Sequence, residues 1–439
     1  MSARELSNVS TKQQRIAELA KQLPDVCFTS LTYHMDLEWM REAYRQTRKD
    51  GAVGVDQVTA EEYEANLDEN LANLLEQAKA GTYFAPPVRR VYIPKGGNRE
   101  EMRPIGIPTL EDKVLQRAVK MLLEPLFEQD FLECSYGFRP GRSPHQALQS
   151  IWQEIMGMRG GWIIDVDIQK YFDTIDHGHL REIIGQRVND GVIRRLIGKW
   201  LNAGVQEDGN ISFPETGSPQ GGVISPLLSN IYLHKVLDVW FKEMVKPRMK
   251  GKVFMTRFAD DVILGFEKEE DARKVLEVLP KRCAKFGLTL HPEKTRLVQF
   301  ISPQRGSEKP SSFDFLGFTH YWDRSRKKNW IVKRKTEKKR LSRKIKEVRE
   351  WCRQNRHGPI REQHATLVKK LKGHFQYYGI TNNGPSLGYF RIELIRAWRK
   401  WLNRRTHKGR YTWEAFLEML RFLPLPQVRI VHSAYSAKP

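Results

Sequence analysis

Cysteine is scarce in this chain of 439 residues. The four cysteines, Cys27, Cys134, Cys283 and Cys352, lie far apart and form neither the paired spacing of a zinc site nor a disulfide framework. Long hydrophobic runs are also missing: no stretch of about 18 apolar residues occurs, and the first residues lack the apolar core of a signal peptide. We therefore expect no membrane-spanning helix and no membrane partner, and the reducing cytoplasm as the location.

Acidic residues are scarce in the last part of the chain. Residues 321–439 contain 31 Lys and Arg against 8 Asp and Glu, a net charge of +23, whereas residues 1–320 carry a net charge of −1. A solvated helical face would mix both signs, but a block of one sign that includes Trp and Tyr is typical of a polyanion-binding module. Because no hydrophobic anchor accompanies the charge, nucleic acid is favoured over an anionic membrane.

The remaining composition predicts a folded chain of about three domains or lobes. Hydrophobic periodicity predicts helices over 12–80 and over about 178–203, 223–240 and 270–286. A further helix is predicted to begin at Thr109, and nearly all of the chain from about 335 onward is predicted to be helical. Thr59 and Glu62 have the spacing of a capping box. Strands are predicted at 88–93, 162–168, 253–258, 262–266, 296–300 and 313–318, with a turn at 94–98.

Acidic residues within apolar strands are the first candidate site. In a strand over 162–168, Asp165 and Asp167 share one face, and an acid there is costly unless it is paired or binds a cation. Asp260 and Asp261 lie between two apolar runs, at the tip of a predicted hairpin. Three carboxylates on neighbouring strands can hold two metal ions about 3.5–4 Å apart for phosphoryl transfer. Taken alone, however, an Asp-Asp pair is more often a polar turn.

The order of the other motifs favours a metal site over a polar turn at Asp260 and Asp261. From first to last they are IPK (93–95) with RPIGIPT (103–109), SYGFRPGRS (135–143), DIQKYFD (167–173), GSPQGGVISPL (217–227), FADD (258–261), Gly287-Leu288 with HPEKT (291–295), and FLGF (315–318). In this order they resemble the group II intron-encoded reverse transcriptases, also called maturases. The resemblance runs from about residue 36 to the end. One departure is Phe258, where most members of the family have Tyr.

The resemblance implies an α+β fold: a right-hand polymerase with fingers, a palm with an antiparallel sheet and a helical thumb, followed by an α-helical maturase domain. The expected boundaries are an N-terminal extension at 1–35, fingers and palm at 36–330, a basic helical thumb at 331–380, and the maturase (X) domain with the tail at 381–439. The ending resembles bacterial members that lack an HNH endonuclease. The 8 scattered acids of residues 321–439 offer no RNase H metal cluster.

The resemblance also implies roles for single residues. Asp167, Asp260 and Asp261 would be catalytic and, with the Ile168 carbonyl, would bind two Mg²⁺ ions, for which Mn²⁺ can substitute. The nucleotide would be bound by Lys95 and Arg103 at the triphosphate, Phe172 as the gate against a 2′-OH, Gln220 in the pocket and Lys294 near the leaving pyrophosphate. Alternatives stay open for these residues: Lys95 and Arg103 in a solvated basic hairpin, Phe172 as an ordinary core residue, Gln220 as a Gly-rich loop residue, and Lys294 as an exposed helix-end lysine.

Cations along the chain would contact RNA. The expected residues are Arg139, Arg142, Lys338, Lys339, Arg340, Arg343, Lys344, Arg399, Lys400, Arg404 and Arg405. Aromatic residues near them, such as Trp398 and Trp401, can stack on bases, although at least half of them are expected to pack helices together.

The implied function is RNA-directed DNA polymerisation by a nucleotidyltransferase that binds its group II intron RNA, assists splicing and copies the intron during retromobility. The partners would be the intron RNA, an RNA template with a DNA primer, dNTPs and target DNA. Two alternatives stay open. One is a free-standing or defence-related reverse transcriptase, and the other is an RNA-binding splicing cofactor with a dormant polymerase, against which the intact Asp triad argues.

Overall fold

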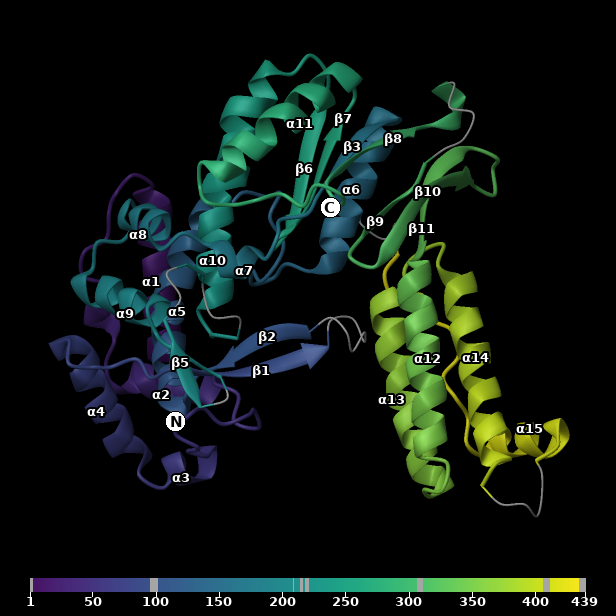
Figure 1. Cartoon of the computed structure of the whole chain (residues 1–439), viewed down its shortest axis with the longest axis horizontal. Coiled ribbons are helices and arrows are strands. Elements are labelled where there is room, and N and C mark those ends of the chain that lie inside the picture. Colours follow the sequence, from purple (N-terminus) through teal and green to yellow (C-terminus); the bar gives the residue numbers. More distant parts are fainter. Residues whose placement is uncertain are drawn as a thin grey trace. The chain divides into compact units, whose positions relative to one another are not determined.

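The computed structural model describes residues 3–94, 102–207, 209–213, 216–217, 221–305, 311–405 and 411–433. Helices and sheets are mixed along this chain, which confirms the predicted α+β class (Figure 1). The chain divides into two compact units: residues 1–147 with 164–297 form unit 1, and residues 148–163 with 298–439 form unit 2. Within the described ranges, none of the helices has both the length and the apolar composition needed to cross a membrane.

The N-terminal part of unit 1 packs around one long helix, α5 (Leu110–Asp130). It begins as predicted at Thr109, whose side chain accepts a hydrogen bond from the Asp112 backbone N–H. Helices α1 (Ala3–Gln22), α2 (Leu37–Gln46) and α4 (Leu67–Ala80) contact α5, and the Trp39 indole donates a buried hydrogen bond of 3.0 Å to the Ala118 carbonyl. Helix α3 (Ala60–Glu64) begins with the predicted capping box of Thr59 and Glu62.

Among the described residues, two four-stranded sheets carry the RPIGIPT and FADD motifs. The first has the order β2-β1-β4-β5 and consists of β1 (Val88–Pro94), β2 (Met102–Ile107), β4 (Val205–Glu207) and β5 (Asn210–Ser212). The second has the order β6-β7-β3-β8 and consists of β3 (Gly160–Val166), β6 (Val253–Phe258), β7 (Asp261–Phe266) and β8 (Arg296–Ile301).

Helices connect the strands of these sheets. They are α6 (Pro144–Met158), α7 (Tyr171–Thr174), α8 (His177–Gly185), α9 (Gly191–Leu201), α10 (Ser225–Leu233) and α11 (Glu269–Ala284). Pro226 lies in the first turn of α10, where a missing N–H costs nothing, so the helix tolerates it. The helix then continues as two π-helical segments, His234–Val239 and Phe241–Val245.

Unit 2 combines a small sheet with a helical part. The sheet has the order β11-β10-β9 and consists of β9 (Phe313–Phe315), β10 (Phe318–Arg324) and β11 (Trp330–Thr336). The helices are α12 (Lys338–Gln354), α13 (Ile360–Tyr378), α14 (Gly384–Leu402) and α15 (Trp413–Phe422). The cores are apolar: Phe300, Phe313 and Phe318 are buried at the sheet, and Leu367 and Trp398 between the helices.

Three predicted elements need correction. The helix expected over 178–203 is two helices, because Asp190 caps a new helix by accepting hydrogen bonds from the Val192 and Ile193 N–H groups. The strand expected over 162–168 ends at Val166, so Asp167 follows the strand. The strand expected over 313–318 is interrupted by a turn at 316–317, between β9 and β10. The hairpin of β10 and β11 was not predicted. The turn predicted at 94–98 lies mostly outside the described residues.

Candidate active site and nucleic-acid interface

Asp260 and Asp261 lie at the tip of the predicted hairpin. Strands β6 and β7 are antiparallel with Phe258 opposite Asp261, so Ala259 and Asp260 form a two-residue turn. Ala259 has a φ of +56°, a left-handed conformation that a two-residue hairpin turn requires and that costs energy for any residue with a Cβ. Such strain is stored where the surrounding structure enforces it.

The segment before α6 enforces this turn. The Arg257 N–H donates to the Cys134 carbonyl at 2.7 Å, and the Tyr136 N–H donates to the Arg257 carbonyl at 2.8 Å. At Gly137, a Cβ would lie 2.3 Å from the Ala259 backbone nitrogen, so only glycine fits against the turn. The SYGFRPGRS motif therefore has a structural role: its backbone holds the Asp260 turn.

A buried ion pair lies beneath the turn. The Arg257 guanidinium binds both carboxylate oxygens of Asp238 at 2.8 and 2.6 Å, and both side chains are fully buried. The same guanidinium donates to Asn230 Oδ1 at 2.9 Å and to the Ala259 carbonyl at 3.2 Å. Burial alone would raise the pKa of Asp238, but the charge of Arg257 holds this pKa below its ordinary value.

Asp167 is held by the segment after α11. The Asp167 carbonyl accepts a hydrogen bond of 2.8 Å from the His291 N–H, and the Asp167 N–H donates to Thr295 Oγ1 at 3.3 Å. Next to it, Ile168 forms a bridge with Leu290. The Lys294 ammonium lies 3.7 Å from Asp167 Oδ2, and both side chains are partly exposed. Two predicted site residues, Asp167 and Lys294, are thus brought together.

Electrostatic coupling joins Asp260 to the other predicted residues. Burial raises the pKa of Asp260, the carboxylate of Asp167 raises it further, and the charge of Arg103 lowers it. Asp261 is exposed at the start of β7. Within the described ranges, no three His, Cys, Asp or Glu side chains are grouped closely enough for a metal site. The three aspartates therefore approach one region of unit 1 without forming a closed cluster.

The predicted nucleotide-binding residues are distributed around this region. Arg103 is exposed on β2, opposite Ile93. Phe172 is partly exposed on α7 and packs edge-on against Tyr171, with ring centroids 5.4 Å apart. Lys95 and Gln220 lie outside the described residues.

The predicted RNA-contacting residues of unit 1 are engaged within the fold. Arg139 is 7% exposed and donates to Glu128 and to the Leu132 and Ser135 carbonyls. Arg142 pairs with Glu133 at 2.5 Å. Arg139 therefore supports the loop that holds the Asp260 turn.

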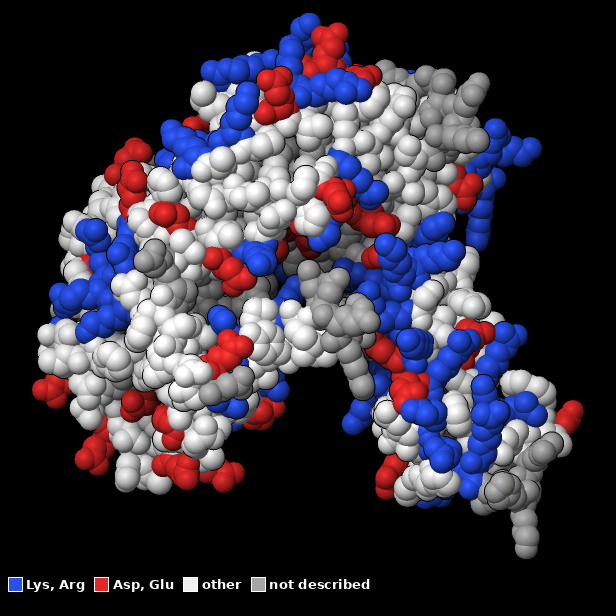
Figure 2. All heavy atoms as spheres, in the orientation of Figure 1, with Lys and Arg blue, Asp and Glu red and all other residues white. Residues whose placement is uncertain are grey.

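The predicted cations of unit 2 lie on its helices, where Lys and Arg gather over α12–α14 (Figure 2). On α12, Lys338, Lys339, Arg340 and Lys344 are exposed and Arg343 is half-buried. Arg340 pairs with Glu337 at 3.1 Å and Lys344 with Glu347 at 2.7 Å.

The cations at the end of α14 divide into two kinds. Lys400 and Arg404 are exposed and lie over the Trp401 ring at 5.6 and 5.2 Å. Arg399 donates to the Tyr411 carbonyl, and Arg405 donates to the His357 and Gly358 carbonyls. Lys400 and Arg404 are therefore better placed to meet a ligand than Arg399 and Arg405.

Sequence reasoning missed the residues that support the site. Arg257, Asp238, Asn230 and Gln116 are buried and hydrogen-bonded, and none was predicted. One signal was present: an arginine in the middle of an apolar strand, as at Arg257, is costly unless a buried acid accompanies it.

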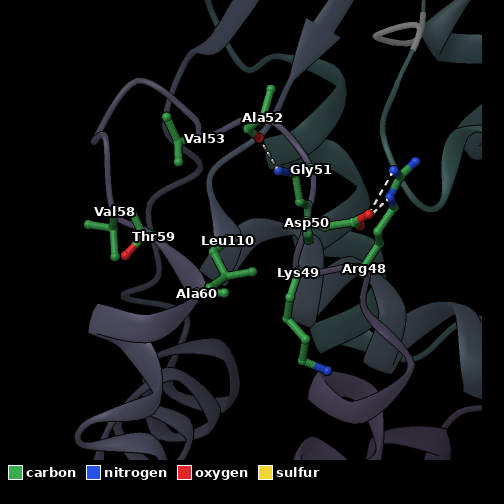
Figure 3. A pocket seen from close by; sticks show the side chains of 11 residues that line it. Arg48, Lys49, Asp50, Gly51, Ala52, Val53, Val58, Thr59, Ala60 and Leu110 are labelled. Carbon is green, nitrogen blue, oxygen red and sulfur yellow. Dashed lines mark hydrogen bonds and ion pairs between the residues drawn. The ribbon is translucent and has the colours of Figure 1, made fainter. Parts of the chain in front are cut away.

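A separate pocket of about 220 Å³ is lined by the loop 48–53 that follows α2 and by the first residues of α3 and α5 (Figure 3). Its basic residues already have partners in this loop or in α2. Arg48 pairs with Asp50, Lys113 donates to the Ala52 carbonyl at 2.9 Å, and Lys49 donates to the Tyr44 carbonyl at 2.9 Å. This pocket is therefore distinct from the carboxylate site.

Comparison with known families agrees with the mixed helices and sheets of this fold. A family model described as reverse transcriptase (RNA-dependent DNA polymerase) matches residues 93–320, just over half of the chain. The chain therefore belongs to the reverse transcriptase family.

The chain is also similar to individual proteins. The group II intron-encoded protein LtrA of Lactococcus lactis is 34% identical over 282 residues, which cover 61% of this chain and 46% of that protein. Protein YkfC of Escherichia coli is 38% identical over 234 residues (52% and 61%), and the uncharacterized 91 kDa protein in the cob intron of Schizosaccharomyces pombe is 29% identical over 258 residues (58% and 31%). The chain matches less than two thirds of each relative's length. These relatives confirm the resemblance predicted from the motifs.

Proposed function

We propose that this chain is an RNA-directed DNA polymerase that binds a group II intron RNA, assists its splicing and copies it. The family match and the hairpin that holds Asp260 and Asp261 at its tip carry the proposal, and the charges of Asp167 and Arg103 act on Asp260 in the same region of unit 1. Acids and a cation in one region suit a reaction on a triphosphate, because the acids can hold divalent cations and the arginine can bind phosphate oxygens.

The donor set fits Mg²⁺. Asp167, Asp260 and Asp261, with the Ile168 carbonyl, would hold the two ions, because hard cations prefer oxygen ligands. The raised pKa of Asp260 supports this, since a bound cation offsets the cost of an ionised carboxylate at a buried turn. When bound, the ions supply electrostatic stabilisation of the attacking and leaving oxygens. Mn²⁺ would serve in place of Mg²⁺.

The remaining residues act on the nucleotide and primer. Arg103, with Lys95, binds the triphosphate and holds the α-phosphate in line with the primer 3′-OH. Lys294 stabilises the charge that develops on the leaving pyrophosphate. Phe172 lies beside the sugar and excludes a 2′-OH, and Gln220 shapes the pocket.

We propose that the domains of the chain form the right-hand arrangement. We assign residues 36–330 to fingers and palm, 331–380 to the thumb and 381–439 to the maturase domain with the tail, after an extension at 1–35. The cations of α12 and α14 contact intron RNA and the template with its primer. Target DNA would be a further partner, and the reducing cytoplasm is the proposed location.

The test of the polymerase is primer extension by the purified protein on an RNA template with a DNA primer, dNTPs and Mg²⁺. RNA-templated DNA synthesis is expected. A folded protein that binds RNA but does not extend the primer would favour a splicing cofactor with a dormant polymerase.

The test of the intron role is the identity of the RNA that copurifies with the protein. A structured intron RNA whose splicing the protein accelerates is expected. Active polymerase without such an RNA would favour a free-standing or defence-related reverse transcriptase.

A further inference from the structure

Gln116 connects α5 to the segment that leads into α10. Its side chain is 4% exposed. The carbonyl Oε1 accepts hydrogen bonds from the Val223 N–H at 2.8 Å and the Ile224 N–H at 3.4 Å. On its other side, Nε2 donates to Asp112 Oδ2 at 3.3 Å. One buried amide thus satisfies two backbone donors at the end of the GSPQGGVISPL motif.

Asp112 determines which way this amide faces. It is 1% exposed, and its Oδ1 accepts a hydrogen bond of 2.5 Å from the Tyr83 hydroxyl. An ionised carboxylate can only accept hydrogen bonds, so Gln116 must direct its NH₂ toward Asp112 and its oxygen toward Val223. Burial raises the pKa of Asp112 to about 6, so the carboxylate is mostly ionised above that pH.

The described ends of the motif loop lie against two elements of the proposed nucleotide pocket. The Gly217 N–H donates to the Ile175 carbonyl at 2.8 Å, and a Cβ at Gly217 would lie 2.9 Å from the Phe172 carbonyl. At Gly221, which has a φ of +119°, a Cβ would lie 2.3 Å from the Gly106 carbonyl of β2, the strand that carries Arg103. Gly217 therefore touches α7, Gly221 touches β2, and Gln116 holds the backbone two residues after Gly221.

We propose that Gln116 is a positioning residue for the incoming nucleotide. Through the Val223 and Ile224 N–H groups it holds residues 221–224 against β2, and so fixes the side of the pocket that carries Arg103. The inference rests on the proposed polymerase function. Gln116 itself does not touch the nucleotide. Its removal would therefore affect nucleotide binding indirectly, through the position of the backbone that it holds.

Gln116→Leu removes both hydrogen-bonding functions with little change in volume. The expected result is a rise of about tenfold in the KM for dNTP, the usual consequence of unpaired buried donors, with a much smaller change in kcat per folded molecule. The matched control is Gln129→Leu on the same helix, because Gln129 is exposed and donates only to the Pro125 carbonyl. Its KM should equal that of the wild type.

Gln116→Glu allows a second measurement, the pH dependence of the KM for dNTP, which would not change if Gln116 only filled space in the core. The new carboxyl keeps the acceptor for Val223 and Ile224, but it faces Asp112, and two neighbouring acids cannot both ionise easily. The other ionisable groups that act on Asp112 or on its Tyr83 partner are Tyr83 itself, Glu111 and Lys113. While the two acids share one proton, the variant reproduces the hydrogen bonds that Gln116 makes in the wild type. We expect its KM for dNTP to approach the wild-type value near about pH 6 and to rise toward alkaline pH, relative to the wild type.

The outcomes separate the inference from the function on which it rests. Absence of extension by the wild type would overturn the polymerase and the inference with it. An active wild type with an unchanged KM in Gln116→Leu, or with parallel pH profiles for Gln116→Glu and the wild type, would overturn the role of Gln116 alone. If Gln116→Leu does not fold, the pH profile of Gln116→Glu decides.

Discussion

Arg257 and Asp238 form a bidentate ion pair in which neither side chain has any exposed surface. The pair connects β6 to the π-helical segment after α10, and the same guanidinium holds the Ala259 carbonyl of the strained turn. The position of Asp260 thus depends on a charge pair that makes no contribution to chemistry itself.

Asp238→Asn should destabilise unit 1 strongly. The change leaves the buried Arg257 charge without its counter-ion, which typically costs about 3–5 kcal/mol. The free energy of unfolding in urea, followed by Trp fluorescence, measures this. In the control Glu269→Gln, the exposed pair with Arg273 is lost, and the expected cost is under about 1 kcal/mol. Similar small costs for both variants would contradict the role assigned to the buried pair.

Phe172→Ala should weaken discrimination against ribonucleotides. Shortening this partly exposed side chain opens space beside the sugar, so the ratio of kcat/KM for dNTP over NTP should fall at least about tenfold. Single-nucleotide incorporation measures the ratio. Tyr171→Phe is the control at the neighbouring position. The buried Tyr171 hydroxyl donates to the Ser229 carbonyl, so its loss should leave the ratio unchanged. An unchanged ratio in Phe172→Ala would assign Phe172 to packing.

His320 should make unit 2 sensitive to acid. The ring is fully buried and stacked on Phe313, and burial, with the charge of Arg334, lowers its pKa from 6.5 to about 3. Between these values the unfolded chain binds a proton that the folded chain does not, so stability is present above about pH 6.5 and falls as the pH decreases toward about 3.

His320→Phe removes this dependence. Its stability relative to the wild type should increase as the pH falls below about 6.5, by up to about 1.4 kcal/mol per pH unit. Urea unfolding at pH values between 7.5 and 4.5, about the range where a histidine titrates, measures the difference. The same substitution at the exposed His357 should show no such trend. A pH-independent difference at His320 would rule out the predicted effect.

Neutralising exposed cations of unit 2 should weaken intron binding more than primer extension. Each lost phosphate contact makes the log–log slope of affinity against salt shallower by about 0.7–0.9. In this variant, four residues are replaced by Gln: Lys338, Lys339, Lys400 and Arg404. The charge-matched control changes to Gln four exposed cations of unit 1, Arg273, Lys274, Lys281 and Lys285.

Splicing and primer-extension time courses on both variants give the comparison. Splicing should slow in the unit 2 variant only, because it requires a large structured RNA, whereas extension requires a few nucleotides near the aspartates. Equal losses of splicing and extension in the unit 2 variant, with the fold intact by circular dichroism, would mean that these cations serve the polymerase cleft.

The elements closest to the aspartates could be predicted from local pattern. Two apolar runs separated by a short polar turn define the hairpin of Asp260, and the Thr109 cap defines the start of α5. The strand over 330–336 was missed because Lys333, Arg334 and Lys335 interrupt its apolar alternation, although Arg334 is buried. Charged residues are expected at the surface unless a partner accompanies them, and that partner is set by tertiary structure.

The supporting residues of the site could not be predicted for the same reason. Arg257 and Asp238 are 19 residues apart, and Gln116 and Val223 are 107 apart, so no local periodicity links either pair. The motif residues could be found from the sequence, and the buried residues outside the motifs that hold them in place could not.

The most direct test of the central claim compares catalysis with RNA binding in Asp260→Asn. Primer extension on an RNA template in Mg²⁺ and affinity for the same RNA are measured on the wild type and the variant. We predict that Asp260→Asn loses extension, because the turn would no longer supply a carboxylate to the proposed metal site. RNA affinity should be nearly unchanged, because the proposed phosphate contacts lie on unit 2. Extension by Asp260→Asn at a rate close to that of the wild type would contradict the assignment of the active site.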